Sequence, residues 1–361
     1  MVAFRKGASM KSKTYIMISV IGMLALVLGF VGLTVYVDPL FHYHAPVEGL
    51  EYPLFDERYM NDGIIRHFDY DAVITGTSMT QNFKTSTLDS LFGTNAIKVP
   101  MSGATYREIN ELLEDAFRYN DNIEMVVRGL DLTMLFTDKD SMSYDEYPEY
   151  LYDDNIFNDV YYVLNKDIFV TYTDYVFEFM ESGGKSSTFD AYKNWHGQYE
   201  YNANALRKGY QRKELSEEQY VLTEEEEAKL RGNMEQNVIE LIKAHPETEF
   251  YLFIPPYSIL YWDDLQRMGT YQKTLEAHRI QVEMLLPYEN VHLYSFFDDY
   301  LMICDLGYYI DSLHYNQFYS EKILQNMKDG IGLLSKENYE EYFKMLIFYD
   351  LFDYEAFFAS E

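Results

Sequence analysis

An uninterrupted apolar run over residues 15–37, without a single charged side chain, constrains this chain more than any other feature. At about 1.5 Å per residue, a helix of this length can cross the roughly 30 Å hydrocarbon core of a bilayer. A cleaved signal peptide has a shorter apolar region, about 7–15 residues, that ends in a small-x-small cleavage site. This run instead leads into Val37-Asp38-Pro39. We therefore favour an uncleaved transmembrane anchor over a signal peptide or a buried core helix.

The charges on either side of the run predict its orientation. The leader, residues 1–14, carries Arg5, Lys6, Lys11 and Lys13 and no acidic residue, whereas acidic side chains dominate the segment that begins at Asp38. By the positive-inside rule, the leader is expected in the cytoplasm and the rest of the chain outside. The sequence thus predicts a single-pass membrane protein with an extracytoplasmic C-terminal domain.

Composition excludes several classes of function. The chain has 59 acidic and 29 basic residues, a net charge of −30, which repels nucleic-acid phosphate and excludes nucleic-acid binding. Cys304 is the only cysteine, so an internal disulfide and a Cys-x-x-Cys zinc or redox site are excluded. A hydrophobic content of 48% is sufficient for a packed core.

Beyond residue 70, short apolar segments alternate with helical patterns. We expect strands at 71–75, 96–99, 123–130, 249–254 and 291–294, and helices at 79–91, 106–119, 223–244, 270–286 and 317–334. Thr223 is the expected N-cap of the third of these helices, whose first turn is acidic. This alternation predicts an α/β fold with a doubly wound, mostly parallel sheet.

Three segments fall outside that rhythm. Residues 38–70 read as a connector punctuated by prolines, and they precede a domain expected over 71–335. Residues of about 137–220, rich in Tyr, Asp and Asn, are expected to form a mainly helical insertion. The acidic and aromatic tail, 336–361, has no assigned role.

Gly76-Thr77-Ser78 follows the first expected strand, and a helix is expected to begin near Met79. Doubly wound sheets bind ligands at the carboxyl ends of their strands, and a backbone N–H at a helix N-terminus stabilises an anion. Ser78 is therefore a candidate nucleophile. The same residue could be a helix N-cap, and taken alone the pattern favours the cap.

Asp311-Ser-Leu-His314 supplies the partners that a nucleophilic serine needs. A serine hydroxyl attacks well only when a base accepts its proton, and histidine suits that task at neutral pH. A carboxylate three residues earlier can fix the imidazole tautomer and stabilise the imidazolium. A surface loop could produce the same pattern by chance. A metal site is the other functional interpretation, but a third convincing ligand is missing.

Four short blocks, in this order, resemble those of the SGNH (GDSL-like) hydrolases over about residues 70–335: Gly76-Thr77-Ser78, Gly103, Gly129-Leu130-Asp131 and Asp311-x-x-His314. The chain looks most like the membrane-anchored members of bacterial surface-polysaccharide clusters, which are relatives of the alginate O-acetyltransferases and of the D-alanyl-transfer protein of teichoic acid operons. Those carry Gly-Thr-Ser or Gly-Ser-Ser in the first block, as here.

The resemblance implies a flavodoxin-like three-layer sandwich anchored in the bacterial cell membrane. It implies Ser78 as nucleophile, His314 as general base and Asp311 as its orienting partner, with the backbone N–H groups of Ser78 and Gly103 in the oxyanion hole. Gly103 could also be a simple turn glycine. The implied substrate is an acyl ester, foremost an acetyl ester, of a cell-envelope glycan. No cofactor is implied, and a multi-span O-acyltransferase is a possible partner that delivers acyl groups.

One residue departs from the family pattern. The third block usually contains an asparagine that donates to the oxyanion, but this chain has Asp131, and an ionised carboxylate can only accept hydrogen bonds. Asp131 could point away, be protonated by burial, or be replaced as donor by another residue such as Asn82. The departure also motivates an alternative function, a non-catalytic module that binds or guides an exported polysaccharide. Trp195, Trp262 and the many tyrosines could stack on sugar rings in either case.

Overall fold

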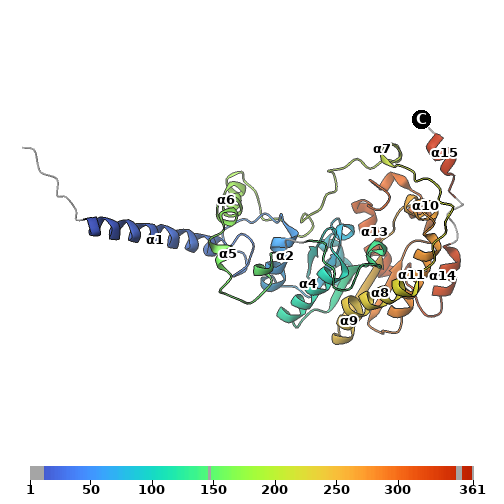
Figure 1. The fold of residues 1–361 in the computed structure, drawn as a ribbon, viewed down its shortest axis with the longest axis horizontal. Helices are drawn as coiled ribbons and strands as arrows, with labels where there is room; N and C mark the ends of the chain where they lie inside the picture. Colours follow the sequence, from blue (N-terminus) through green and yellow to red (C-terminus); the bar gives the residue numbers. More distant parts are fainter. Residues whose placement is uncertain (1–11, 145–147, 347–351, 360–361) are drawn as a thin grey trace, which may run out of the picture. The chain divides into compact units, whose positions relative to one another are not determined.

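The computed structural model describes residues 12–144, 148–346 and 352–359 (Figure 1). Arg5, Lys6 and Lys11 of the leader and parts of the acidic tail lie outside the described residues. The chain divides into two compact units. One combines Met1–Pro53 with Pro148–Ser186, and the other combines Leu54–Tyr147 with Ser187–Glu361.

The smaller unit is built around α1, Ser12–Val37, whose most apolar window has a mean hydropathy of 2.7 and no buried residue. This helix has the length and composition of a membrane anchor or of a signal sequence. The unit also contains four short elements: η3 (Glu149–Leu151), α5 (Val160–Val163), the π-helix η4 (Asp167–Thr173) and α6 (Asp174–Glu181). Both α5 and η4 pack against α1.

The larger unit contains a five-stranded parallel sheet in the order β2-β1-β3-β4-β5. The strands are β1 (Ala72–Gly76), β2 (Ala96–Pro100), β3 (Met125–Gly129), β4 (Glu249–Ile254) and β5 (Val291–Ser295). Every residue of β1, β2 and β3 is buried, as expected for parallel strands covered on both faces. The predicted doubly wound α/β fold is confirmed, and the strand order reverses between β1 and β3, where such sheets bind ligands.

Helices cover both faces of this sheet. On one side α2 packs on α4, α4 packs on the continuous helix α8–η5–α9, and α8 packs on α11, whereas α3 packs on α13. Their bounds, with those of the other helices of the larger unit, are α2 Glu57–His67, η1 Ser78–Thr80, α3 Thr85–Phe92, α4 Tyr106–Tyr119, η2 Leu132–Met134, α7 Ala203–Gly209, α8 Glu224–Met234, η5 Glu235–Ile239, α9 Glu240–Ala244, α10 Ile259–Arg267, α11 Tyr271–Leu285, α12 Tyr300–Ile303, η6 Leu306–Tyr308, α13 Gln317–Asp329, α14 Tyr339–Met345 and α15 Tyr354–Ala359.

Local signals account for several helix ends. Thr223 and Glu226 form the capping box that begins α8, so the predicted N-cap is confirmed. The helix expected to begin near Met79 is instead a single 3₁₀ turn, η1, followed by α3. The segment expected to be a plain connector contains α2, which begins after Asp56, an N-cap whose carboxylate accepts the backbone N–H groups of Arg58 and Tyr59.

Candidate active site

The carboxyl ends of β1 and β2 lie side by side, since Gly76 pairs with Pro100. Gly76 has φ +148°, a conformation that L side chains rarely adopt, and a Cβ there would lie 2.7 Å from the Thr80 side chain. This glycine therefore lets the chain turn tightly between β1 and η1. Ser78 is the first residue of η1, and the N-cap is Thr77, whose side chain accepts the backbone N–H of Met79. Ser78 is thus not a helix N-cap.

Ser78, His314 and Asp311 form a continuous hydrogen-bonded chain. Ser78 Oγ lies 2.8 Å from His314 Nε2, and His314 Nδ1 lies 2.8 Å from Asp311 Oδ2. The other carboxylate oxygen of Asp311 accepts the backbone N–H groups of Leu313 and His314, at 2.8 and 2.7 Å. A His314 tautomer with its proton on Nδ1 donates to Asp311 and leaves Nε2 to accept the serine proton.

The loop that carries His314 is fixed from three directions. Its own backbone closes through the N–H of Ile310, which donates to the carbonyl of His314 at 3.0 Å. The backbone N–H of Ser258, just after β4, donates to the carbonyl of Ser312 at 3.0 Å. The Tyr315 hydroxyl donates to the carbonyl of Met79 at 3.1 Å. The histidine is therefore held against the turn that carries the serine.

The electrostatics of the pair suit a catalytic base. Burial alone would lower the pKa of His314, but the hydrogen bond and charge of Asp311 outweigh it and raise that pKa above its ordinary value of 6.5. Burial pushes the pKa of Asp311 upward, and the hydrogen bond and charge of His314 reverse this, so the Asp311 pKa falls below 3.8. Asp311 is consequently ionised at neutral pH and stabilises an imidazolium.

Two of the backbone N–H groups expected in the oxyanion hole have no protein acceptor among the described residues. Within the described ranges, the N–H groups of Ser78 and Gly103 donate to no other protein group. Gly103 is exposed and has φ +67°, the left-handed conformation of a turn glycine. Gly103 does not line the cavity that holds Ser78, so an oxyanion role for its N–H stays a prediction.

A cavity of about 350 Å³ opens in front of the serine. It is lined by Ser78, Gln81, Ser102, Trp195, Tyr199, Ile310, Asp311 and His314. The Trp195 ring meets the imidazole of His314 edge to face, with ring centroids 6.0 Å apart. Ser78, Asp311 and His314 were predicted from the sequence, whereas no motif pointed to Gln81, Ser102, Tyr199 or Ile310.

Gln81 is oriented by a buried carboxylate that sequence patterns did not reveal. Glu57, the first residue of α2, is 3% exposed and accepts hydrogen bonds from the Gln81 side-chain amide and from the backbone N–H of Ser102. Burial raises the pKa of Glu57 above its ordinary value, although both hydrogen bonds act against this. Lys98, buried in β2, donates to the carbonyl oxygens of Gln81 and Phe83. The Gln81 turn is thus fixed through both its side chain and its backbone.

The two tentative oxyanion residues lie elsewhere. Asn82 is 1% exposed; its Oδ1 accepts the backbone N–H of Trp195 at 3.1 Å and its Nδ2 donates to the carbonyl of Tyr315 at 3.4 Å. It ties the Trp195 loop and the Tyr315 loop to the segment after η1. Asn82 does not line the cavity, and an oxyanion role for it stays a prediction.

Asp131 points beneath the nucleophile turn. Its Oδ2 accepts the Thr77 hydroxyl at 2.8 Å and its Oδ1 accepts the Tyr257 hydroxyl at 2.6 Å. The side chain is 4% exposed and does not line the cavity. Burial raises the pKa of Asp131, while its two hydrogen bonds and the charge of His314 lower it by less. Of the possibilities open from the sequence, the geometry matches an Asp131 that points away from the cavity.

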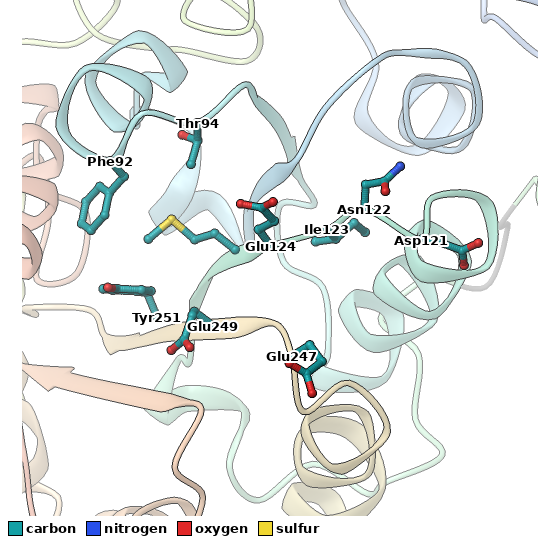
Figure 2. Close-up of a pocket in the computed structure, with 10 residues that line it drawn as sticks. Phe92, Thr94, Asp121, Asn122, Ile123, Glu124, Glu247, Glu249 and Tyr251 are labelled. Carbon is teal, nitrogen blue, oxygen red and sulfur yellow. The ribbon is translucent and has the colours of Figure 1, made fainter.

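Further cavities lie elsewhere among the described residues of the larger unit. One of about 360 Å³ adjoins the serine cavity, with which it shares Ile310 and Asp311 as lining residues. Another, of about 550 Å³, lies at the amino-terminal ends of β3 and β4, among the carboxylates of Asp121, Glu124, Glu247 and Glu249 (Figure 2). Among the described residues no group of three or more His, Cys, Asp or Glu side chains is arranged to hold a metal ion. Doubly wound sheets bind ligands at the carboxyl ends of their strands, whereas this cavity lies at the amino-terminal ends. Its larger volume therefore does not make it the candidate active site.

Comparisons with known proteins show no family for this chain. No protein-family model matches this chain, and no curated protein does. A solved structure described as "a putative platelet activating factor" from Streptococcus pneumonia is similar in fold, with a TM-score of 0.38 and 13% sequence identity. The similarity covers 76% of this chain and 91% of the other.

Proposed function

We propose that this protein is a serine esterase or O-acyltransferase that acts on acyl esters, foremost acetyl esters, of a cell-envelope glycan. The observation that carries the proposal is the hydrogen-bonded chain from Ser78 through His314 to Asp311. The proposal includes anchorage in the bacterial cell membrane by α1, with the larger unit on the extracytoplasmic side. The membrane-anchored SGNH proteins that the sequence resembles motivate both the glycan and the location.

The reaction would proceed in two balanced steps. Ser78 Oγ bonds to the acyl carbon while its proton passes to His314 Nε2, and the ester C–O bond then breaks as the leaving alcohol takes that proton. Water, or a sugar hydroxyl, next gives its proton to His314 and attacks the acyl carbon; the acyl–Oγ bond breaks and Ser78 Oγ takes the proton back from His314. Water as acceptor gives hydrolysis and a sugar gives transfer. For transfer, the proposal includes a multi-span O-acyltransferase partner that loads the serine.

The developing oxyanion needs donors. The N–H groups of Ser78 and Gly103 supply two in this proposal, and the Gln81 amide, which Glu57 orients at the cavity wall, supplies the third. This assignment replaces the asparagine that the family carries in its third block. Asp131, with both oxygens occupied beneath Thr77, neither donates to the oxyanion nor lies in the cavity.

The aromatic wall supports a sugar as substrate. Trp195 and Tyr199 both line the cavity, and Tyr199 is 55% exposed, so both present ring surface to a ligand. Flat apolar faces combined with a few convergent polar groups are typical of ligand cavities of this size. A Trp195→Ala variant is expected to raise KM for an acetylated oligosaccharide more than for a small acetyl ester. An equal rise for both substrates would count against the glycan.

Labelling with a fluorophosphonate probe tests the nucleophile directly. The wild-type protein should be labelled and should release or transfer acetyl groups from an acetylated glycan, and Ser78→Ala should lose both properties. Ser102→Ala, which removes the other serine of the same cavity wall, is the matched control and should retain labelling. If Ser78→Ala fully restored the cellular phenotype of a deletion strain, the proposal would fall and a non-catalytic polysaccharide-binding module would replace it.

A further inference from the structure

The segment that follows η3 exposes an unusual number of large apolar side chains. Phe157 is 87% exposed and Ile156 is 73% exposed. Five more continue through α5, η4 and α6 with exposures between 41% and 64%: Val160, Tyr161, Leu164, Val170 and Tyr175. Soluble proteins rarely expose so many neighbouring apolar groups unless the surface binds something.

Contacts with α1 fix the depth of this segment relative to the apolar span. Tyr162 in α5 lies level with Asp38, the first residue after α1, because its hydroxyl donates to the Asp38 carboxylate at 2.6 Å. Asp38 is fully buried and also accepts the backbone N–H groups of His42, Tyr43 and His44. This polar cluster marks the end of the apolar helix.

The lower end of the segment lies alongside the apolar helix itself. Phe169 in η4 packs edge to face on Phe30 of α1, with ring centroids 4.5 Å apart. Phe30 precedes Val37, the last residue of α1, by about seven residues, which places it roughly 10 Å further along the helix axis. Between Tyr162 and Phe169 the segment therefore runs from the polar end of α1 to a level about 10 Å inside the apolar run, within the same compact unit.

We propose that residues 156–176 form an interfacial seat, whose exposed apolar side chains enter the leaflet that surrounds the C-terminal end of α1. Interfacial helices bury an apolar face about 5–10 Å into the boundary between headgroups and acyl chains, which matches the depth set by Phe169. The inference rests on the proposed anchorage by α1. We favour lipid over a protein partner because the seat contacts Phe30, a residue of α1. In the proposed anchorage, lipid surrounds α1 at this level.

The charged side chains of the segment agree with an interfacial rather than a deeper position. Asp159 is paired with His42 and with the Tyr43 hydroxyl near the Asp38 cluster. Lys166 and Asp167 are exposed at the start of η4, and Asp174 is exposed at the start of α6. A lysine can extend its ammonium group to the headgroups while its stem remains in apolar surroundings. Carboxylates tolerate the headgroup region but not the hydrocarbon centre.

Depth-dependent quenching tests the seat in the full-length chain. A Cys304→Ser background is given single cysteines by Phe157→Cys and Leu164→Cys in the seat, Leu26→Cys in α1, and Lys185→Cys as an exposed control in the same unit. Each is labelled with an environment-sensitive fluorophore and reconstituted into phosphatidylcholine vesicles with or without spin-labelled lipid. Both seat positions are highly exposed, so the labels do not disturb the fold.

We expect spin-labelled lipid to reduce emission at positions 26, 157 and 164 and to leave position 185 unchanged. Quenching at 26 but not at 157 and 164, with both open to aqueous iodide, would overturn the seat and leave the anchor intact. Protection of 157 and 164 from iodide without quenching by lipid would overturn it in favour of a protein partner or a second copy of the chain. Loss of quenching at 26 would overturn the anchor and the seat together, whatever the result for Ser78 labelling.

Discussion

Substitutions at Asp131 distinguish two roles for this residue. It either accepts hydrogen bonds beneath the nucleophile turn or belongs to the oxyanion hole. The two hydrogen bonds that it accepts join the turn after β1 to the segment after β4, through Thr77 and Tyr257. Asp131→Ala removes both acceptors at once. Asp131→Asn keeps one acceptor oxygen and turns the other into a donor, so one of the two hydroxyl groups must reorient to accept.

The expected losses follow from the burial of the partners. Tyr257 is fully buried and Thr77 is 4% exposed, so water cannot replace the lost acceptor. A hydrogen bond to a charged group contributes about 1.5–3 kcal/mol and a neutral one about 0.5–1.5 kcal/mol. The Thr77 hydroxyl still accepts the backbone N–H of Met79, but its proton loses the Asp131 acceptor. We expect Asp131→Ala to lower the free energy of unfolding by about 2–4 kcal/mol and Asp131→Asn by about 1 kcal/mol.

The same substitution has a defined pH dependence. Burial raises the pKa of Asp131 above 3.8, so the folded protein holds this proton more tightly than the unfolded chain does. The resulting contribution to stability is fully present below the unfolded pKa and is lost as pH rises through the raised, folded one. Asparagine lacks this contribution. The stability of the wild type relative to Asp131→Asn should therefore decrease as pH rises from about 4.

Urea unfolding at a series of pH values measures the loss of stability and its pH dependence. The kcat/KM for a small acetyl ester measures whether Asp131 affects catalysis. Because Asp131 does not line the cavity, Asp131→Asn should keep kcat/KM within a few-fold of the wild type. An increase of tenfold or more in kcat would mean that position 131 faces the oxyanion, as in the family pattern. Equal destabilisation by alanine and asparagine would also refute the acceptor role.

Three further predictions concern neighbouring residues. Asp311→Asn should lower kcat roughly 10³–10⁴-fold, because the imidazole loses the group that fixes its tautomer. It should also shift the acid limb of the kcat/KM profile to lower pH, because Asp311 holds the pKa of His314 above 6.5. An unchanged midpoint of that limb would contradict this role of Asp311. Gln81→Leu should reduce kcat about 10²–10³-fold with little change in KM if its amide is an oxyanion donor, measured on a small acetyl ester beside Ser102→Ala as a control in the same cavity wall. Burial lowers the pKa of Lys98 from 10.5 to about 7, so the unfolded chain binds this proton more tightly than the folded protein. The free energy of unfolding should therefore increase as pH rises between these values, and Lys98→Met should lack that increase in urea unfolding.

Sequence patterns predicted the architecture because they depend on local spacing. Short apolar segments between helical patterns identified all five strands, and their parallel order places every carboxyl end at one edge. Ser78 and the Asp311–His314 pair lie 236 residues apart in sequence, and each pattern alone was weak. The requirement that a serine nucleophile has a base connected the two, and their 2.8 Å contact agrees with it.

What the sequence did not reveal depends on single contacts between distant segments. Glu57 belongs to a helix whose segment reads as a connector, and nothing in its surroundings indicates that it accepts from Gln81 and Ser102. The partners of Asp131 come from residues 54 positions earlier and 126 positions later. Such pairings carry no periodicity, because each requires only one side chain at one place. They emerge only when the sheet brings the strand ends together.

The Asp131 contacts show why position 131 can hold a carboxylate where the SGNH proteins that the sequence resembles have an asparagine. Thr77 and Tyr257 each bring a hydroxyl proton to the same buried point, and a carboxylate offers an acceptor oxygen to both. An asparagine in that position could satisfy only one of them without forcing the other hydroxyl to reorient. The chain thus exchanges a donor into the cavity for two acceptors under the nucleophile turn. In the proposed esterase the third donor is Gln81, three residues after Ser78 and oriented by a buried carboxylate, whose side-chain amide lines the cavity wall.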